Sequence, residues 1–289
     1  MKPSFSNVIQ GCMTWGIWGK DLTTRDMADR INLALQLGIS TFDHADIYGD
    51  YTTEAAFGKA LMESGADRDQ MQIITKCGIQ YVGNTRDNAI KHYQYDADYI
   101  IWSAEKSIAD LQCDYLDLFL LHRPSPLMHP DEIQKAVSKL MEQGKIRSFG
   151  VSNFTNSQCD LIRSTTAISA NQIEFSLTAH QAMLDGSLDY MKLNNILPMC
   201  WSPLGGVFRE ENEQTGRIKK TLTELCEVYQ AEPDQLLLAW IMKLPAGIHP
   251  VIGTTDPERM KQAIDASKIE LSEVDWFKLW VASMGHKVP

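Results

Sequence analysis

The stretch Thr41-Phe42-Asp43-His44-Ala45-Asp46-Ile47-Tyr48-Gly49 contains the end of an apolar segment and the polar residues that follow it. The segment from Ile39 to Phe42 is predicted to form a short buried strand. Asp43 and Tyr48 would then lie where a strand of an α/β barrel ends and its active-site loop begins. An Asp at a strand end is often a turn residue, and a Tyr is often a packed aromatic, so this stretch needs support from elsewhere in the chain.

Two further apolar runs end in ionisable side chains. Lys76 follows Ile73-Ile74-Thr75, and His122 follows Leu118-Phe119-Leu120-Leu121. Barrel enzymes assemble their catalytic groups from the carboxyl ends of different strands. We therefore expect these two side chains to converge with the Asp and the Tyr of the first stretch.

Strand-like runs alternate with helix-like periods along most of the chain. Predicted strand ends fall near Gln10, Asp43, Lys76, His122, Ser152, Glu174, Ser202 and Ile252. Eight such units within 289 residues fit a (β/α)8 TIM barrel better than an open doubly wound sheet. No linker or shift in composition divides the chain, so residues 1–289 are predicted to form a single domain. An extra C-terminal helix is expected from Ser272 to Met284, with Ser272 as its cap.

Two segments near the predicted barrel mouth are candidates for substrate contacts. The polar segment from Gln80 to Asp96 is predicted to be a long irregular loop, and such loops are usually lids, binding loops or disordered. A glycine-rich loop after the first strand carries Trp15 and Trp18. Together with Tyr81, these two tryptophans are expected as pocket walls, although packing is an equally good interpretation for each.

Composition limits the classes of partner. The formal net charge is -10, with 37 acidic and 27 basic residues and no basic run, which argues against nucleic acid or an anionic membrane as the main partner. Six scattered cysteines without a C-x-x-C pair predict neither a disulfide framework nor a thiolate metal site. No signal region is apparent, and no apolar stretch approaches the roughly 18 residues of a membrane span. We expect a cytoplasmic protein that starts with its mature sequence and binds a small molecule, without a metal.

The four groups at the predicted mouth suit a proton-donating tyrosine. A free phenol has a pKa of about 10, so it is a poor acid at neutral pH unless a nearby cation stabilises the phenolate. Lys76 would be that cation, and Asp43 would pair with it, because an unpaired buried ammonium is costly. His122 could hydrogen-bond the same substrate oxygen and stabilise its developing charge. A purely structural ion pair and a core histidine are the alternative interpretations.

These motifs resemble those of the aldo-keto reductase family. Phe42-Asp43-x-Ala45-x-x-Tyr48-Gly49 is similar to the family's tyrosine motif, Ile74-Thr75-Lys76 to its lysine strand, and the segment from Tyr115 to His122 to its histidine motif. The resemblance implies an oxidoreductase in which an aldehyde or ketone accepts a hydride from NADPH at its carbonyl carbon and a proton from Tyr48. Acid catalysis of this kind is worth about 10²- to 10⁴-fold. The catalytic residues implied are Tyr48, Asp43, Lys76 and His122.

The resemblance also implies a nicotinamide site, although no G-x-G-x-x-G motif is present. Gly150-Val151-Ser152-Asn153-Phe154 is similar to the family segment whose Ser and Asn bind the nicotinamide carboxamide, and Asn171-Gln172 to the glutamine site of the next strand. Trp201 stands where the family has an aromatic stacked on the nicotinamide, and Ser202-Pro203-Leu204 matches the segment after the seventh strand. The contacts implied here are Ser152, Asn153, Gln172, Trp201, Ser202 and Leu204.

The cofactor phosphates are expected at Gly253, Thr254 and Thr255, before the helix that opens at Asp256, because its free N–H groups and dipole attract anions. Arg259 matches the family arginine that contacts the adenosine 2′-phosphate, which favours NADP(H) over NAD(H). Gln262 is a further expected adenine contact. Gly253 and Ala263 depart from the lysine and asparagine of many members, which weakens the expected preference for NADP(H).

Two other functions stay open at this level. Lys76 on a barrel strand could form a Schiff base with a carbonyl substrate, as in an aldolase. The chain could also be a nicotinamide-binding regulatory or channel-associated subunit, since relatives of this fold can act as sensors. The resemblance extends in order from about Gly11 to Arg259, nearly the whole chain, and favours the reductase.

Overall fold

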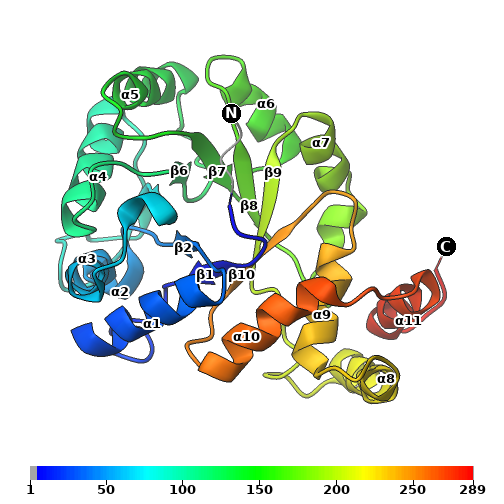
Figure 1. Cartoon of the computed structure of the whole chain (residues 1–289). Helices are drawn as coiled ribbons and strands as arrows, with labels where there is room; N and C mark the ends of the chain where they lie inside the picture. Colours follow the sequence, from blue (N-terminus) through cyan, green and yellow to red (C-terminus); the bar gives the residue numbers. More distant parts are fainter. Residues whose placement is uncertain (1–4, 289) are drawn as a thin grey trace.

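Eight parallel strands close into a barrel in the computed structural model, which describes residues 5–288 (Figure 1). The barrel strands are β1 (Ile9–Gly11), β2 (Thr41–Asp43), β3 (Gln72–Cys77), β6 (Leu118–Leu121), β7 (Phe149–Ser152), β8 (Ala170–Glu174), β9 (Leu197–Trp201) and β10 (His249–Ile252). Their order around the barrel is β1-β10-β9-β8-β7-β6-β3-β2, and the pairing of β1 with β10 closes it. The predicted (β/α)8 fold is confirmed.

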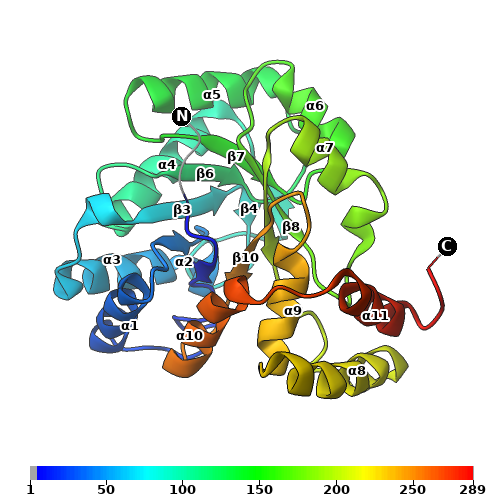
Figure 2. The ribbon, with the colours of Figure 1, turned by 45° about the vertical axis from the view of Figure 1, so that its right-hand side comes forward.

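Helices form a ring outside the strands (Figures 1 and 2). They are α1 (Thr24–Gln36), α3 (Thr53–Ser64), α4 (Ala97–Asp110), α5 (Pro130–Glu142), α6 (Asn156–Arg163), α7 (Ser187–Leu193), α8 (Glu213–Tyr229), α9 (Pro233–Met242), α10 (Pro257–Asp265) and α11 (Glu273–Met284), with the short α2 (Tyr48–Tyr51) at the end of β2. Local sequence explains where helix α11 begins. Ser272 caps α11 as predicted by accepting a hydrogen bond from the backbone N–H of Asp275.

Several element boundaries differ from the sequence-based expectation, which starts β2 at Ile39, β6 at Leu116, β7 at Ile146, β8 at Ile168 and α8 at Ile218. Helix α8 begins at Glu213 rather than at Ile218, because the side chain of Asn212 caps it. The fourth and fifth barrel strands begin later than predicted, since Leu116 and Ile146 share only an isolated bridge before regular pairing starts. These shifts leave the strand ends that carry the polar residues in place.

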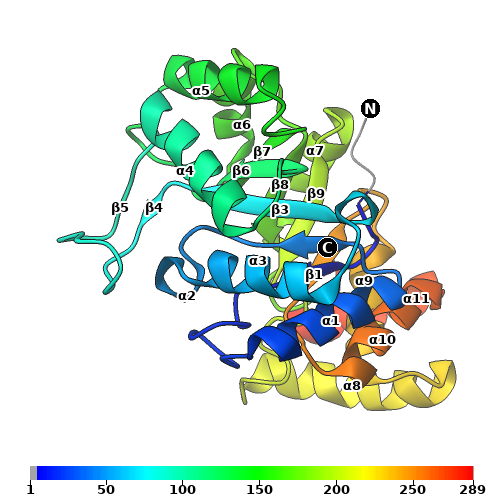
Figure 3. The same cartoon turned by 60° about the vertical axis from the view of Figure 1, so that its left-hand side comes forward.

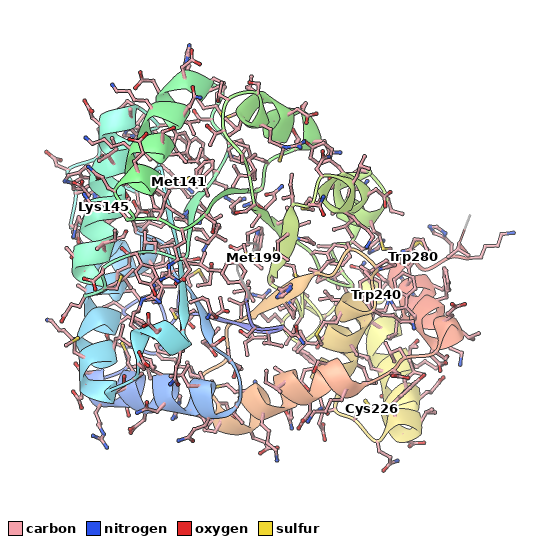
Figure 4. All side chains as sticks on the ribbon, turned by 45° about the horizontal axis from the view of Figure 1, so that its top comes forward. Met141, Lys145, Met199, Cys226, Trp240 and Trp280 are labelled. Atoms are coloured by element: carbon pink, nitrogen blue, oxygen red, sulfur yellow. The ribbon has the colours of Figure 1, made fainter. Side chains whose placement is uncertain are left out.

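The apolar core has two layers. A small cluster fills the barrel, where Met199 lies among the strands (Figure 4). A larger cluster fills the space between the strands and the ring of helices. At the edge of that layer, the rings of Trp240 and Trp276 stack with centroids 4.9 Å apart. Each indole N–H donates to the other residue's carbonyl oxygen, which joins α11 to α9.

The segment from Gln80 to Asp96 corrects one expectation, because it is not irregular throughout. Strands β4 (Ile79–Gln80) and β5 (His92–Tyr93) pair antiparallel and form a hairpin that projects beyond the barrel (Figure 3). Each strand is only two residues long, and β5 is exposed, so no alternating pattern marked it in the sequence. We call residues 79–93 the β4–β5 hairpin.

All six cysteines are free thiols. Among residues 5–288, no helix has both the length and the apolar character needed to cross a bilayer. Within the same range, no group of three or more His, Cys, Asp or Glu side chains is arranged to hold a metal ion.

Candidate active site

Lys76 lies at the centre of a buried polar cluster at the carboxyl ends of β2, β3 and β6. Its ammonium donates to both carboxylate oxygens of Asp43, each at 2.8 Å, and to the carbonyl oxygen of His44 at 2.7 Å. It also lies 3.2 Å from the hydroxyl of Tyr48. Burial lowers the pKa of Lys76, but Asp43 and then Tyr48 outweigh burial and leave it above the ordinary value. The lysine is therefore charged at neutral pH.

The hydroxyl of Tyr48 is protonated in this environment. Burial raises the pKa of Tyr48, and the neighbouring Lys76 lowers it by less, so the net shift is upward. Lys76 thus acts in the expected direction on the pKa of the phenol, but desolvation is the larger influence. A protonated phenol beside a fixed cation can give up its proton to a substrate oxygen, and the cation then stabilises the phenolate.

His122 faces Tyr48 across the mouth. The two ring centroids are 6.1 Å apart, and the backbone N–H of His122 donates to the carbonyl of Cys77 at 2.9 Å, which ties β6 to β3 at this level. The ring atom Nδ1 is buried and has no hydrogen-bond partner. Burial, followed by the charge of Lys76, lowers the pKa of His122 well below its usual value. The neutral imidazole can therefore donate one hydrogen bond without carrying charge.

The backbone directly after Tyr48 has an unusual conformation. Gly49, Asp50 and Tyr51 have φ values of 58°, 54° and 65°, all in the left-handed region. A Cβ on residue 49 would lie 2.4 Å from Thr53 Oγ1, so glycine is required there. For L-residues this conformation costs roughly 1–2 kcal/mol each, and for a bulky residue such as Tyr51 it is rare. Contacts elsewhere must hold it, and strain of this kind clusters at functional sites.

The residues expected around the nicotinamide gather at the ends of β7, β8 and β9. Ser152 Oγ donates to the carbonyl of Gln172 at 2.9 Å and accepts from Asn153 Nδ2 at 2.7 Å. The indole N–H of Trp201 donates to Asn153 Oδ1 at 2.9 Å. Gln172 also makes a contact that the sequence did not indicate, because its amide Nε2 donates to Asp43 Oδ1 at 3.0 Å. The glutamine side chain therefore links β8 to the buried ion pair of Asp43 and Lys76.

The segment after β9 turns sharply away from the barrel. Ser202 has a left-handed φ of 54°, and its carbonyl accepts the N–H of Gly205. Its hydroxyl accepts from Arg209 Nη2 at 3.2 Å. Leu204 is half-buried and packs against the outer core layer. Ser202 and Leu204 thus follow Trp201 directly, at the carboxyl end of β9.

Gly253, Thr254 and Thr255 connect β10 to the first turn of α10. No atom lies within 4 Å of a Cβ built on Gly253, so the space in front of this loop is open. Asp256 caps the helix by accepting the N–H of Arg259, whose side chain is exposed. Gln262 is half-buried on the same helix, where its carbonyl accepts from Gln235.

Sequence reasoning missed a cation at this loop. Arg30 of α1 donates from Nε to the carbonyl of Thr255 at 2.6 Å, which fixes the loop from the side. Gln10 of β1 donates to the carbonyl of Thr254 at 3.1 Å. Both residues are more than 220 positions from the loop, and only the pairing of β1 with β10 brings them together.

The three aromatic residues expected in the pocket have different surroundings. Trp18 lies between Tyr81 and Tyr48, with ring centroids 5.2 Å and 6.5 Å away, and it is half-buried at the mouth. Trp15 is fully buried and packs against Phe42 and Phe57 in the outer core layer. Its position favours the packing interpretation and does not support a pocket role, because its ring has no exposed face.

Two buried carboxyl groups behind the site were also missed. Glu54 accepts from the hydroxyls of Thr75 and Ser107, and burial raises its pKa to about 7. Asp46 accepts from the hydroxyls of Tyr99 and Ser103, and burial raises its pKa to about 7 as well. The sequence of helix α3 gave no indication that Glu54 is buried, because its hydroxyl partners come from β3 and α4.

Comparison with known proteins agrees with this architecture. The model of the Aldo/keto reductase family matches residues 7–280. The chain is 38% identical to Oxidoreductase YdhF of Escherichia coli over 99% of this chain and 96% of that protein. It is 36% identical to 6-dehydroglucose reductase of Agrobacterium fabrum over 96% and 95% of the two chains. The crystal structure of the thermostable aldo-keto reductase Tm1743 with the inhibitor epalrestat superposes with a TM-score of 0.81, at 26% identity over 96% and 94% of the chains.

A family match along nearly the whole chain coincides with a closed eight-stranded barrel and with four polar side chains at the ends of β2, β3 and β6. The protein belongs to the aldo/keto reductase family of oxidoreductases.

Proposed function

We propose that this protein is an NADPH-dependent carbonyl reductase in which Tyr48 donates the proton. The observation that supports it best is the position of Lys76, whose ammonium contacts the carboxylate of Asp43 and the hydroxyl of Tyr48 at once. This arrangement keeps a cation beside the phenol throughout proton transfer. The proposed substrates are aldehydes and ketones, because their carbonyl oxygen takes up one proton when the carbonyl carbon is reduced.

The proposed reaction divides the work between cofactor and protein. When NADPH is bound, it would supply the hydride for the carbonyl carbon. Tyr48 transfers its proton to the carbonyl oxygen, which completes the alcohol, and Lys76 stabilises the phenolate that remains. Neutral His122 orients the same oxygen by hydrogen bonding. Asp43 holds the lysine in place and charged.

The chemistry of the surrounding residues fits a nicotinamide cofactor. Ser152 and Asn153 present hydroxyl and amide groups of the kind that bind a carboxamide, beside the flat ring of Trp201. Their mutual hydrogen bonds would be exchanged for bonds to the ligand. Gln172, whose Nε2 donates to Asp43, adds an amide from the neighbouring strand. The open loop at Gly253 and the exposed side chain of Arg259 suit a phosphate group, which supports NADP(H) over NAD(H).

The charge of Lys76 argues against a Schiff-base aldolase. A nucleophilic amine must be neutral, whereas this ammonium has four acceptor oxygens around it and a raised pKa. Its buried position also leaves it behind the hydroxyl of Tyr48. Trapping of a substrate on Lys76 by borohydride, without turnover of the cofactor, would reverse this conclusion.

Replacement of Tyr48 by Phe tests the proposal. NADPH binding, followed by fluorescence, should remain, and reduction of a panel of aldehydes and ketones should fall by at least about 10²-fold. The matched control is Tyr190→Phe, which removes a phenol hydroxyl from the outer surface of α7 and should leave both properties unchanged. A Tyr48→Phe variant that reduces carbonyls at the wild-type rate would exclude the mechanism.

The panel should include sugar aldehydes. Two relatives are named 6-dehydroglucose reductase, at 36% and 33% identity. We therefore propose that oxidised sugars are among the compounds to test, beside simple aldehydes. Tight NADPH binding without turnover of any of them would instead support a regulatory role.

A further inference from the structure

We propose that Asp50 and Tyr51 are positioning residues, which couple the β4–β5 hairpin to the catalytic Tyr48. The inference rests on the proposed role of Tyr48 as proton donor. It assigns a function to the left-handed backbone after that residue and to the hairpin contacts that hold it. Neither residue touches the expected position of the reacting atoms, so their action is indirect.

The carboxylate of Asp50 binds the backbone of the hairpin. Its Oδ2 accepts the N–H groups of Asn84 at 2.7 Å and Thr85 at 3.1 Å. The side chain is buried, and Gly83 approaches so closely that a Cβ there would lie 2.1 Å from Asp50 Oδ1. Two consecutive N–H groups on one carboxylate oxygen form a specific, charge-assisted contact. The tip of the hairpin is thus bound at one point to the segment after Tyr48.

Tyr51 makes the second connection, at the base of the hairpin. Its hydroxyl donates to the carbonyl of Ile79 at 3.1 Å and accepts the N–H of Tyr81 at 2.8 Å. The guanidinium of Arg86 lies over its ring, 3.6 Å from the centroid. Arg86 in turn lies 3.9 Å from the carboxylate of Asp46. The ring is therefore held at its edge and at its face by residues of one hairpin.

These contacts explain why an unfavourable backbone persists beside a catalytic residue. Residues 49–51 cannot relax into a right-handed helix without withdrawing the Asp50 carboxylate and the Tyr51 hydroxyl from the hairpin. The same segment fixes the Cα of Tyr48, whose hydroxyl must stay 3.2 Å from Lys76. Misplacement of a reacting group by about 1 Å can cost about 10²-fold in rate. The hairpin is therefore part of what orients the proton donor.

The other side of the hairpin faces the mouth. Tyr81, whose backbone N–H binds Tyr51, also contacts Trp18, and Trp18 contacts Tyr48. A carbonyl compound that rests against Tyr81 and Trp18 would thus press on the element that positions the tyrosine. The β4–β5 hairpin would therefore both contact the substrate and orient the proton donor.

Three substitutions at Asp50 separate the hydrogen bonds from the backbone strain. Asp50→Ala removes the acceptor, and Asp50→Gly removes it while making the left-handed conformation favourable. Asp50→Asn keeps an acceptor oxygen and tolerates this conformation. We expect kcat for glyceraldehyde and benzaldehyde to fall about 10- to 100-fold in the Ala and Gly variants, with smaller changes in KM and in NADPH affinity. The Asn variant should recover most of the rate.

Amide hydrogen exchange supplies a measurement that does not depend on turnover. Exchange at Asn84 and Thr85 should accelerate in Asp50→Gly and stay slow in Asp50→Asn. Asp87→Ala, which removes an exposed carboxylate from the same loop, is the matched control and should change neither exchange nor kcat. Tyr51→Phe tests the second connection and should also lower kcat while the protein stays folded.

Wild-type kcat in both Asp50→Ala and Asp50→Gly would overturn the proposal, as would an Asn variant as slow as the Gly variant. Unchanged exchange at Asn84 and Thr85 in Asp50→Gly would overturn it as well. Failure of the proposed function looks different, since Tyr48→Phe would then remain active. In that case the exchange data still decide whether the hairpin holds residues 49–51.

Discussion

Lys76 Nζ lies 2.8 Å from each carboxylate oxygen of Asp43, and both side chains are almost completely buried. A buried ion pair of this kind adds little net stability compared with apolar residues, but removal of one partner leaves an uncompensated charge. Gln172 donates a further hydrogen bond to the same carboxylate. The pair is thus held by polar contacts from β8 and from the backbone after β2.

A double-mutant cycle on this pair should show strong coupling. Asp43→Ala leaves the Lys76 ammonium buried without its partner and should lower the free energy of unfolding by about 3–5 kcal/mol. In Asp43→Ala with Lys76→Met, the loss should be much smaller than the sum of the two single losses. Urea denaturation of the four proteins gives the coupling energy. Additive losses would mean that the pair is not energetically linked.

The exposed Arg259 should decide between the two nicotinamide cofactors. Arg259→Ala should weaken NADPH binding by about 10- to 100-fold, the range of a hydrogen bond to a charged group, and leave NADH binding nearly unchanged. Lys261→Ala, which removes an exposed cation from the same helix, is the control. Fluorescence titration measures both affinities. Equal losses for the two cofactors would remove Arg259 from the 2′-phosphate site.

The two neighbouring tryptophans should respond differently to truncation. Trp15→Ala opens a cavity in the core and should destabilise the protein by about 3–5 kcal/mol. Trp18→Ala should cost much less stability and instead raise the KM for carbonyl substrates, because its ring lies at the mouth beside Tyr48. Thermal unfolding and steady-state kinetics distinguish the two roles. The reverse pattern would assign the pocket wall to Trp15.

Glu54 should make stability depend on pH around neutrality. Burial raises its pKa from about 4.5 in the unfolded chain to about 7 in the fold, so the folded state binds the proton more tightly. Its contribution to stability is complete below about pH 4.5 and is lost as the pH rises through about 7. Between about pH 5 and pH 8, wild type should therefore lose up to about 3 kcal/mol relative to Glu54→Gln. Unfolding curves measured at about pH 5 and about pH 8 give the free energy of unfolding of both proteins. A difference between the two proteins that is the same at both pH values would refute the raised pKa of Glu54.

The barrel and the polar cluster at the ends of its strands could be predicted from local sequence. Each of Asp43, Lys76 and His122 ends a short apolar run, and parallel strands that share a barrel bring such ends to one face. The helices between them have clear periods and caps, as at Thr23 before α1. The family resemblance then suggested a role for each residue, and these roles remain predictions, whereas the family itself is confirmed.

Other features depend on contacts between distant segments. The β4–β5 hairpin has two-residue strands, too short for a periodic pattern, and the left-handed backbone at Asp50 and Tyr51 is stabilised by that hairpin. The burial of Glu54 depends on hydroxyl groups from β3 and α4. Arg30 reaches the loop before α10 only because the barrel is closed. None of these relationships has a counterpart in local sequence.

The hydrogen bond from Gln172 to Asp43 joins residues 129 positions apart, one on β8 and the other on β2. Asp43, Lys76 and His122 all come from the first 122 residues of the chain. The carboxylate of Asp43 nevertheless receives this hydrogen bond from the second half of the chain. Contacts of such separation form slowly, after local structure. During synthesis, the first four barrel strands would therefore carry Asp43, Lys76 and His122 without the hydrogen bond from Gln172. The last hydrogen bond to the Asp43 carboxylate would form only when β8 docks beside β7 and completes this side of the barrel.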